Sequence, residues 1–585
     1  MEEQKKETQK HPLREGAFCG SLPRQQRKQT ERRFRLFLIP VFLGTFFCLW
    51  YIHAASCDVI YSDYIRLIDA YLPDVGNLKK LLTPDVLTRI PASFLQRLLN
   101  VRLFSFSVTF DRLCGIFGLF LCGTALARYA SERRMGFCVY LSVTALLFSL
   151  NKWEILLNGT AWAHVVSFGL FFWNYVLLDR IAQGTDPGFC PQQETAPQII
   201  PPQTGFRLKE ALQFQNGLRR RALLLCAFPF FLLLFAGEYI GAYSGTMLLC
   251  YGFLMIQEKN GGEKRRTKWR SREGRAEAGG AGKARSTGCS RFSLYLAGFL
   301  CTLAALFLYL LSRHFAVWEH AGATELSFFE AVPAEPWFLP RFFLKTFAGA
   351  VLGQETIASL LERGILGDGG VLLLGFLVLL SYLLAFLLYW KERLYQKSIF
   401  PLLLLLSGMA NHVLVTASRW IFLREDYALS SRYGAQFMVG LIGILLTFGL
   451  WLRERKRDSY GLEEFLQGSV QIGQEKAAVE QRKLQGRSEG NRENPWNVRI
   501  CKGILMGFCI LFLAGNCYTT LEEIRKAPYR EQNYEELSLT VRDYQSVPEE
   551  LLRTRLEWNK SSETMYRALD ILRENRLNVF RDTAF

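Results

Sequence analysis

The sequence predicts an all-α, polytopic membrane protein, a bundle of transmembrane helices. Half of its 585 residues are hydrophobic, and 46 of them are Phe, which is too apolar for an average set of soluble domains. The same composition excludes a disordered chain and a small disulfide-rich secreted protein. The hydrophobic residues also gather in long runs, and a helix that crosses a bilayer needs about 20 mostly apolar residues.

About eleven runs meet this requirement, and the third, fifth and eleventh are the shortest. The first follows 35 mostly polar residues, so it does not resemble a cleaved signal peptide. The predicted spans are Leu36–Ile52, Ser107–Ala127, Gly136–Leu150, Ala161–Leu178, Ala222–Ala236, Ile240–Ile256, Phe292–Ser312, Val371–Trp390, Ile399–Ser418, Gly434–Leu452 and Ile504–Tyr518.

The net charge of +17 first suggests nucleic acid or an anionic surface as a partner. Ten Lys and Arg precede Leu36, which predicts a cytoplasmic N-terminus, because basic residues favour the cytoplasmic side. Alternation from there gives the inner segments 44 of the 70 basic residues and 23 of the 53 acidic ones. The charge therefore indicates orientation in a cell membrane, and no nucleic-acid partner is predicted.

This topology divides the chain into a basic tail, a bundle and an outer C-terminal tail. The outer loops contain amphipathic stretches such as Phe94–Leu103 and Arg341–Leu361, which predict helices on the outer face. The C-terminal tail is expected to form a small helical appendage outside the cytoplasm. The divisions are 1–35 for the tail, 36–518 for the bundle, 53–106 and 313–370 for the outer loops, 179–221, 257–291 and 453–503 for the featureless inner loops, and 519–585 for the appendage.

Cysteine and histidine residues show no metal-ligand spacing. Most of the 14 Cys lie within apolar runs, where they act as small hydrophobic residues. Cys57 and Cys517 lie near the outer boundary, so a disulfide between them is one alternative. No cofactor is predicted with certainty, although a divalent metal is one alternative among the outer His and acidic residues.

The first outer loop opens with two carboxylates, Asp58 and Asp63, shortly after an apolar span. A carboxylate that is partly removed from water is a candidate general base for a hydroxyl group. Arg89 in the same loop, together with Arg66 and Arg97, is a candidate for binding phosphate. The alternative interpretation is a pair of helix-capping Asp residues with solvated Arg side chains.

Further polar candidates also fall where spans meet the outer surface, whereas the spans themselves are almost free of charge. Lys152 and Glu154 are candidates for binding substrate, or they pair with each other. Glu238 lies between two closely spaced spans, where it is solvated, paired or functional. Arg432 and Tyr433 lie at the mouth of a span, where the alternative for Arg432 is snorkelling to the interface.

This layout resembles the GT-C superfamily of polytopic glycosyltransferases and the bacterial membrane proteins grouped with it. The likeness rests on the many spans, on the acidic start of the first outer loop (Asp58 to Tyr64), on Ser431-Arg432-Tyr433 and on the outer appendage. The adjacent acid pair or DxD motif of several such families is absent, because Asp58 and Asp63 are five residues apart. The resemblance implies transfer of a sugar from a polyprenyl-phosphate donor to a glycan or lipid acceptor of the cell envelope.

In that scheme Asp63, or else Asp58, deprotonates the acceptor hydroxyl, and Arg89, Lys152 and Arg432 neutralise the leaving lipid phosphate. Two other classes remain open from the sequence. One is a non-catalytic membrane protein, such as a flippase, exporter or scaffold for glycans or lipids. The other is a different membrane enzyme of envelope assembly, such as a glycan polymerase or a phosphotransferase.

Overall fold

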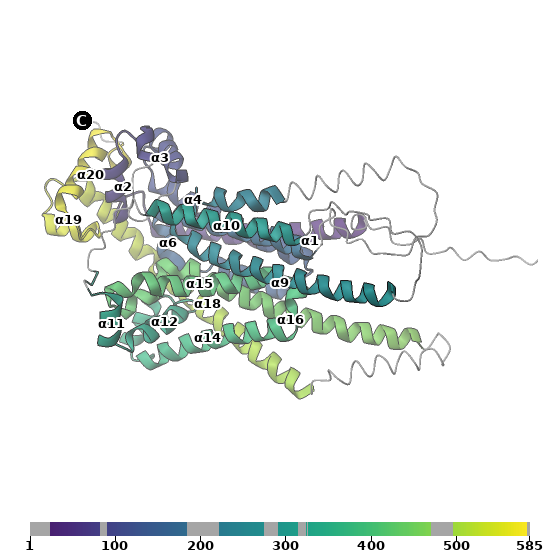
Figure 1. The fold of residues 1–585 in the computed structure, drawn as a ribbon. Coiled ribbons are helices and arrows are strands. Elements are labelled where there is room, and N and C mark those ends of the chain that lie inside the picture. Colours follow the sequence, from purple (N-terminus) through teal and green to yellow (C-terminus); the bar gives the residue numbers. More distant parts are fainter. Residues whose placement is uncertain are drawn as a thin grey trace, which may run out of the picture.

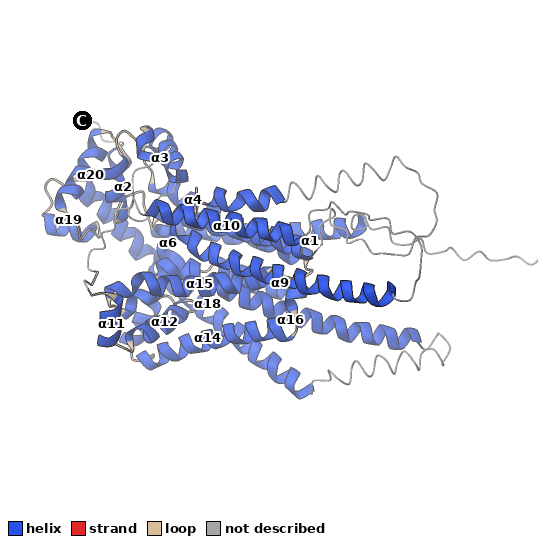
Figure 2. Ribbon diagram, in the orientation of Figure 1, coloured by secondary structure: helices blue, strands red, loops and turns tan. Residues whose placement is uncertain are grey.

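The computed structural model describes residues 24–81, 91–183, 222–273, 291–313, 323–324, 326–469 and 495–581. All regular structure in these ranges is helical, and none of the described residues forms a strand (Figure 2). The predicted all-α class is therefore confirmed.

Nine helices in the described part of the chain include a stretch that is long and apolar enough to cross a membrane. The chain is therefore a multi-pass membrane protein, whose helices run side by side as one elongated bundle (Figure 1). These helices are α1 (Arg24–Ala55), α4 (Val108–Glu132), α7 (Trp162–Gln183), α9 (Ile240–Glu273), α10 (Arg291–Arg313), α14 (Asp368–Lys391), α15 (Phe400–Arg419), α16 (Gly434–Ser469) and α18 (Pro495–Arg542).

The other two predicted spans correspond to shorter helices. They are α5 (Phe137–Leu147) and the segment Ala222–Leu232. Eleven residues of α-helix rise only about 16 Å, which is well short of a hydrocarbon layer of about 30 Å.

The short helix α5 connects two helices that run in the same direction. Gly118 of α4 lies against the backbone of Val165 in α7, so closely that a side chain at Gly118 would collide with it. Near the ends of the same helices, Glu132 forms an ion pair with Arg180. Because α4 and α7 are parallel, the residues between them must bring the chain back along the bundle.

Three helices extend well beyond the predicted spans. Helices α9 and α16 continue to Glu273 and Ser469, and α18 begins at Pro495, so parts of the predicted inner loops 257–291 and 453–503 are helical. These extensions are rich in Lys, Arg, Glu and Gln, which are good helix formers, and extending an existing helix avoids the cost of a new nucleus. Helices α9, α16 and α18 reach toward the same end of the bundle in Figure 1.

The opposite end of the bundle carries the appendage, which we define as α2 (Asp63–Tyr71), α19 (Glu549–Arg555), α20 (Ser562–Glu574) and the end of α18. Its core joins residues from both ends of the chain, such as Ile65 and Ile68 with Leu552 and Leu569. The first outer loop and the C-terminal tail, predicted as separate segments, therefore fold as one unit. The helical character predicted for the tail is confirmed, whereas its location outside the cytoplasm stays a prediction.

Short helices fill the rest of this end of the bundle. The predicted amphipathic stretch Arg341–Leu361 is divided between two of them. Cys57 and Cys517 carry free thiols, so the structure does not contain the disulfide considered between them. The short helices are α3 (Pro91–Phe104), α6 (Trp153–Leu157), α11 (Phe328–Ala334), α12 (Phe338–Gly349), α13 (Gln354–Glu362) and the 3-10 turns η2 (Leu150–Lys152), η4 (Gly237–Tyr239) and η8 (Ser431–Tyr433).

Candidate functional site

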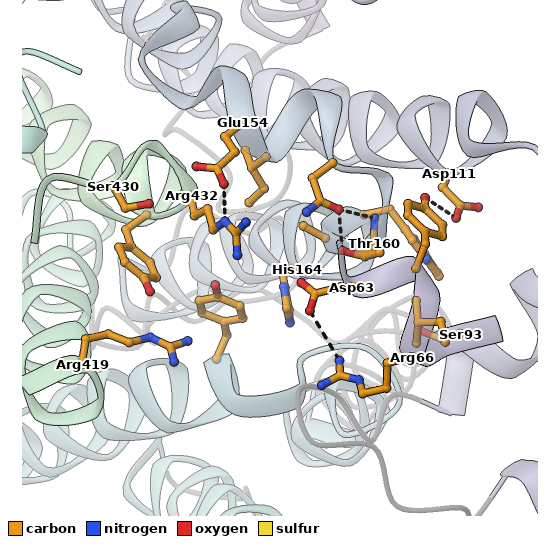
Figure 3. A pocket seen from close by; sticks show the side chains of 18 of the residues that line it. Asp63, Arg66, Ser93, Asp111, Glu154, Thr160, His164, Arg419, Ser430 and Arg432 are labelled. Atoms are coloured by element: carbon orange, nitrogen blue, oxygen red, sulfur yellow. Dashed lines mark hydrogen bonds and ion pairs between the residues drawn. The ribbon is translucent and has the colours of Figure 1, made fainter. Parts of the chain in front are cut away.

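A cavity of about 510 Å³ lies where the appendage meets the ends of α4, α7 and α15. Residues from twelve different helices and turns line it, so it exists only in the folded chain, and Figure 3 shows some of these residues. Six basic side chains face four acidic ones among its described lining residues, which gives it a positive balance. The basic residues are Arg66, Arg97, Arg419, Arg424, Arg432 and Lys560, and the acidic ones are Asp63, Asp111, Glu154 and Asp426.

Asp63 is the first residue of α2, where a carboxylate is favoured by the helix dipole. The turn before it is held to the appendage, because the Ser62 amide donates to the Leu556 carbonyl at 2.7 Å. Among the described residues, the nearest partner of the Asp63 carboxylate is Arg66, with 3.9 Å between Oδ1 and Nη2. At that distance the ion pair is loose, so one partly exposed carboxylate is left able to accept a proton.

Glu154 is held much more tightly, by residues of the turn η8. The Arg432 guanidinium donates through Nε to one carboxylate oxygen (Figure 3). The Ser431 hydroxyl donates to the other oxygen at 2.9 Å. The carboxylates of Glu154 and Asp63 also act on Glu557 nearby, whose pKa is raised by burial and by these two charges, against the opposing effect of Arg432. Arg432 is thus surrounded by negative charge.

A buried carboxylate, Asp111, closes the cavity beside α3. Its Oδ2 accepts a hydrogen bond from the Tyr64 hydroxyl at 2.8 Å, and its Oδ1 accepts from the side-chain amides of Asn100, at 2.7 Å, and Gln96. Gly159 packs directly over this group, so closely that a side chain there would collide with Tyr64 and Asp111. Three donors occupy the carboxylate, which therefore positions α2 and α3 relative to α4.

The remaining basic side chains differ in how they are engaged. Arg424 pairs with Asp426, whereas the guanidinium of Arg97 lies over the Tyr71 ring, 3.8 Å from its centre. Lys560 comes from the loop after α19 and has no hydrogen-bond or ion-pair partner among the described residues. Arg97 and Lys560 are therefore the cations that a bound anion would reach at the least cost in broken ion pairs.

Aromatic and amide groups complete the lining. His164 packs edge-to-face on Tyr239, with 4.4 Å between the ring centres, and Trp162 borders the same region. The Asn158 side-chain oxygen accepts hydrogen bonds from the amide and hydroxyl of Thr160, at 3.1 and 2.6 Å. Such a wall of rings and neutral polar groups suits an uncharged polar ligand with an apolar face.

Of the site residues predicted from the sequence, Asp63, Glu154, Arg432 and Tyr433 meet in this cavity. The first and last of them are about 370 residues apart in the sequence. They were predicted together because each lies near the predicted outer end of a membrane span.

Asp58 does not line the cavity, so its role as an alternative base stays a prediction that the cavity does not support. Its Oδ1 accepts hydrogen bonds from the amides of Val108 and Thr109, at 2.6 and 3.2 Å, and Arg581 contacts its Oδ2. The carboxylate therefore satisfies amide groups that the first turn of α4 leaves without helical partners. The capping interpretation is correct for Asp58 and does not apply to Asp63 in the same way.

Lys152 is also misplaced by the prediction, for it faces the interior of the bundle. Its ammonium group donates to the Ser149 carbonyl at 2.7 Å and lies 3.6 Å from the sulfur of Met438. The residue is 1% exposed, so it neither binds a substrate in the cavity nor pairs with Glu154. Burial lowers the pKa of Lys152 to about 8.

Two predicted residues are not placed. Arg89 and the side chain of Glu238 lie outside the described residues.

Lys152→Met is expected to leave the protein as stable as the wild type or to make it more stable. A buried charge with one carbonyl partner is costly, and a methionine fills a similar volume. The folded-state pKa is below the ordinary value, so the cost is full below about pH 8 and disappears as the pH approaches 10. Thermal unfolding in detergent at pH 7 and pH 10 measures both effects, and a variant that unfolds earlier than wild type at pH 7 would contradict them.

Two residues of the cavity escaped the sequence-based search, Asp111 and Lys560. Asp111 is not among the residues predicted for the site, and its neighbour Arg112, of opposite charge, points elsewhere and donates to the carbonyls of Leu157 and Cys57. A carboxylate within an apolar span is itself a signal of function, and this signal was present. For Lys560, one of many basic residues in the predicted tail, the sequence offers no signal.

No group of three or more His, Cys, Asp or Glu side chains in the described ranges is arranged to hold a metal ion. In the comparisons with known proteins, no protein-family model, curated protein or solved structure matches this chain.

Proposed function

We propose that this protein is an integral membrane glycosyltransferase, which transfers a sugar from a polyprenyl-phosphate donor to a glycan or lipid acceptor of the cell envelope. The observation that carries the proposal is the cavity at the appendage end of the bundle, where the loosely paired Asp63 faces a surplus of basic side chains. A base and a phosphate-binding group are the two elements that this reaction requires.

Asp63 is the proposed general base, because the other carboxylates of the cavity are already engaged. Glu154 is bound by Arg432 and Ser431, and Asp111 accepts three hydrogen bonds. Among the described residues, the Asp63 carboxylate forms an ion pair with Arg66, at 3.9 Å. This contact engages one carboxylate oxygen, Oδ1, and it leaves the other oxygen to accept a proton from an acceptor hydroxyl.

The proposed step is a single displacement. The acceptor oxygen attacks the anomeric carbon as its proton passes to Asp63, and the bond from that carbon to the phosphate oxygen breaks. The electron pair of the broken bond leaves with the lipid phosphate. Because the acceptor attacks opposite the leaving group, the configuration at the anomeric carbon is inverted. The leaving phosphate needs no general acid, and one carboxylate is sufficient.

Phosphate binding is proposed for Arg97 and Lys560, which replace Lys152 in this role. Cations aimed at the developing charge of the leaving group stabilise the transition state, and loss of one such donor typically costs about 3 kcal/mol. Arg432 contributes less directly, because its guanidinium already neutralises Glu154. Its role in this scheme is to hold the Glu154 carboxylate by an ion pair, so that Asp63 is the carboxylate left to act on the acceptor.

The test uses the purified full-length protein, reconstituted into liposomes with a panel of polyprenyl-phosphate sugars and an acceptor glycan. Release of polyprenyl phosphate together with an inverted glycoside supports the proposal. A flippase would move the labelled donor across the liposome bilayer and release no phosphate. A phosphotransferase would transfer sugar and phosphate together, and either of these outcomes would overturn the proposal.

Lys560→Met is expected to raise the KM for the donor about tenfold or more, since a hydrogen bond to a charged group contributes about 1.5–3 kcal/mol. Steady-state kinetics at varied donor concentration measure this effect. The matched control is Arg567→Met, which removes a cation of the same appendage that pairs with Asp69 at the surface. The assignment of Lys560 is wrong if both variants give the same KM.

A further inference from the structure

Helix α3 is amphipathic in the opposite sense to a helix of a water-soluble protein. Its exposed side chains include Leu95, Leu99 and Leu103, which are 62%, 50% and 69% exposed. Spaced four residues apart, these leucines follow one stripe along the helix. The buried side chains include Gln96, Arg97 and Asn100, none of which is more than 8% exposed. These polar groups thus point inward and the three leucines of the stripe point outward.

The inward face is fixed by hydrogen bonds and ring contacts. Gln96 and Asn100 donate to the Asp111 carboxylate, and Arg97 lies over the Tyr71 ring. Asn100 also exchanges two hydrogen bonds with the backbone of Ser107, at 2.8 and 2.9 Å. Rotation of α3 to bury its leucines would break all of these contacts, so the orientation of the helix follows from the polar core beside it.

The leucine stripe is continuous with apolar surface on the neighbouring membrane-crossing helix. Phe104, at the end of α3, stacks on Phe110 of α4, with 4.4 Å between the ring centres. Along α4 the exposed apolar surface continues through Leu113 and Phe117, which are 46% and 54% exposed.

The same stripe adjoins a second apolar segment at the start of α3. The Ala92 amide donates to the Leu234 carbonyl at 3.0 Å. Leu234 and the preceding Phe231 and Phe230 are exposed. The exposed apolar band therefore runs over three elements that meet at the appendage end of the bundle, and one of them, α4, is a membrane-crossing helix.

We propose that α3 lies in the membrane surface, with its leucine stripe in lipid, and forms the lipid-side wall of the cavity. The occupant of the stripe is lipid rather than another protein, because the stripe merges with the faces that membrane-crossing helices present to hydrocarbon. Arg102, exposed on the same helix, is placed to reach the phosphates of headgroups.

This position brings the cavity to the level of the lipid headgroups. The thickness of one helix then separates hydrocarbon from Arg97 and Asp111. If the proposed function is correct, a lipid-linked phosphate reaches Arg97 without leaving the plane of the membrane. That consequence rests on the proposed function, whereas the placement of α3 does not, and the test below measures only the placement.

The test is photo-crosslinking of the full-length protein in liposomes that contain a phospholipid with radiolabelled acyl chains. The photoreactive residue p-benzoylphenylalanine replaces Leu95, Leu99 or Leu103, one at a time. These side chains are exposed, so the bulky probe fits without repacking. Leu383, half exposed on the membrane-crossing helix α14, is the positive control. Glu563, on α20 of the appendage and 86% exposed in its side chain, is the negative control.

We expect the three α3 positions to incorporate lipid label at no less than half the level of Leu383 and at least fivefold above that of Glu563. Label at the level of Glu563 would show that the stripe faces water, and a crosslink to a second protein chain would show a protein partner. Either result overturns the proposal. Neither affects the glycosyltransferase assay, which fails or succeeds independently.

Discussion

Asp63→Asn is expected to lower kcat for sugar transfer by about 10²–10⁴-fold, the usual contribution of a positioned general base. The amide has the shape of the carboxylate but does not accept the proton of the acceptor hydroxyl. The side chain is partly exposed and its only described ion pair, with Arg66, is loose at 3.9 Å. The substitution is therefore expected to leave the fold and donor binding nearly unchanged.

The matched control for this variant is Asp69→Asn, six residues along the same helix. Asp69 pairs with Arg567 on the surface of the appendage and does not line the cavity. Rates of polyprenyl phosphate release separate the two variants, and donor binding measured without acceptor tests whether the site remains intact. Wild-type turnover by Asp63→Asn would remove Asp63 from the role of base. Equal losses in both variants would point to a role of α2 in the fold alone.

The sequence predicted the membrane class and the end of the bundle at which polar groups gather, for a clear physical reason. A membrane-crossing helix must be apolar along its whole length, so its limits are visible in composition. Polar residues that follow several spans on the same side are then brought together by the alternation of the chain. Asp63, Glu154 and Arg432 were found in this way, although they are far apart in sequence.

The partners of each side chain were not predictable, because they depend on local turns. Lys152 and Glu154 are two residues apart, yet the change from the turn η2 to the helix α6 directs them to opposite environments. Lys152 enters the bundle and Glu154 faces the cavity. In the same way, adjacent Asp111 and Arg112 bind different segments. A sum of charges along the sequence treats such neighbours as one neutral unit. In an α-helix, however, adjacent side chains point in directions about 100° apart around the helix axis.

The far end of the bundle depends on a buried carboxylate that sequence reasoning assigned to a loop. Asp179, near the end of α7, is 2% exposed. Its Oδ1 accepts hydrogen bonds from the Ser398 hydroxyl at 2.9 Å and from the Ile399 amide at 2.6 Å, which fixes the start of α15. Its Oδ2 accepts from the guanidinium of Arg133, just beyond the end of α4. One side chain therefore joins three membrane-crossing helices.

Asp179→Ala is expected to destabilise the protein by about 3–5 kcal/mol, the usual cost of breaking a buried ion pair by removing one partner. The loss exceeds that of an ordinary hydrogen bond, because the Arg133 cation and the Ile399 amide are left buried without their acceptor. Denaturant titration in detergent micelles measures the shift. The matched control is Glu132→Ala at the same end of the bundle, whose ion pairs are more exposed and are expected to contribute about 1 kcal/mol or less.

A second substitution separates the ion pair from the other contacts of Asp179. If the unpaired cation causes most of the loss, Arg133→Met in the Asp179→Ala background should recover part of the stability, because the buried charge is removed as well. No recovery would assign the loss to the Ser398 and Ile399 contacts at the start of α15. If Asp179→Ala lowers the free energy of unfolding no more than Glu132→Ala does, the buried carboxylate contributes no more to stability than the exposed ion pairs, and the prediction is wrong. Since the cavity lies at the other end, kcat measured below the unfolding range should stay near the wild-type value.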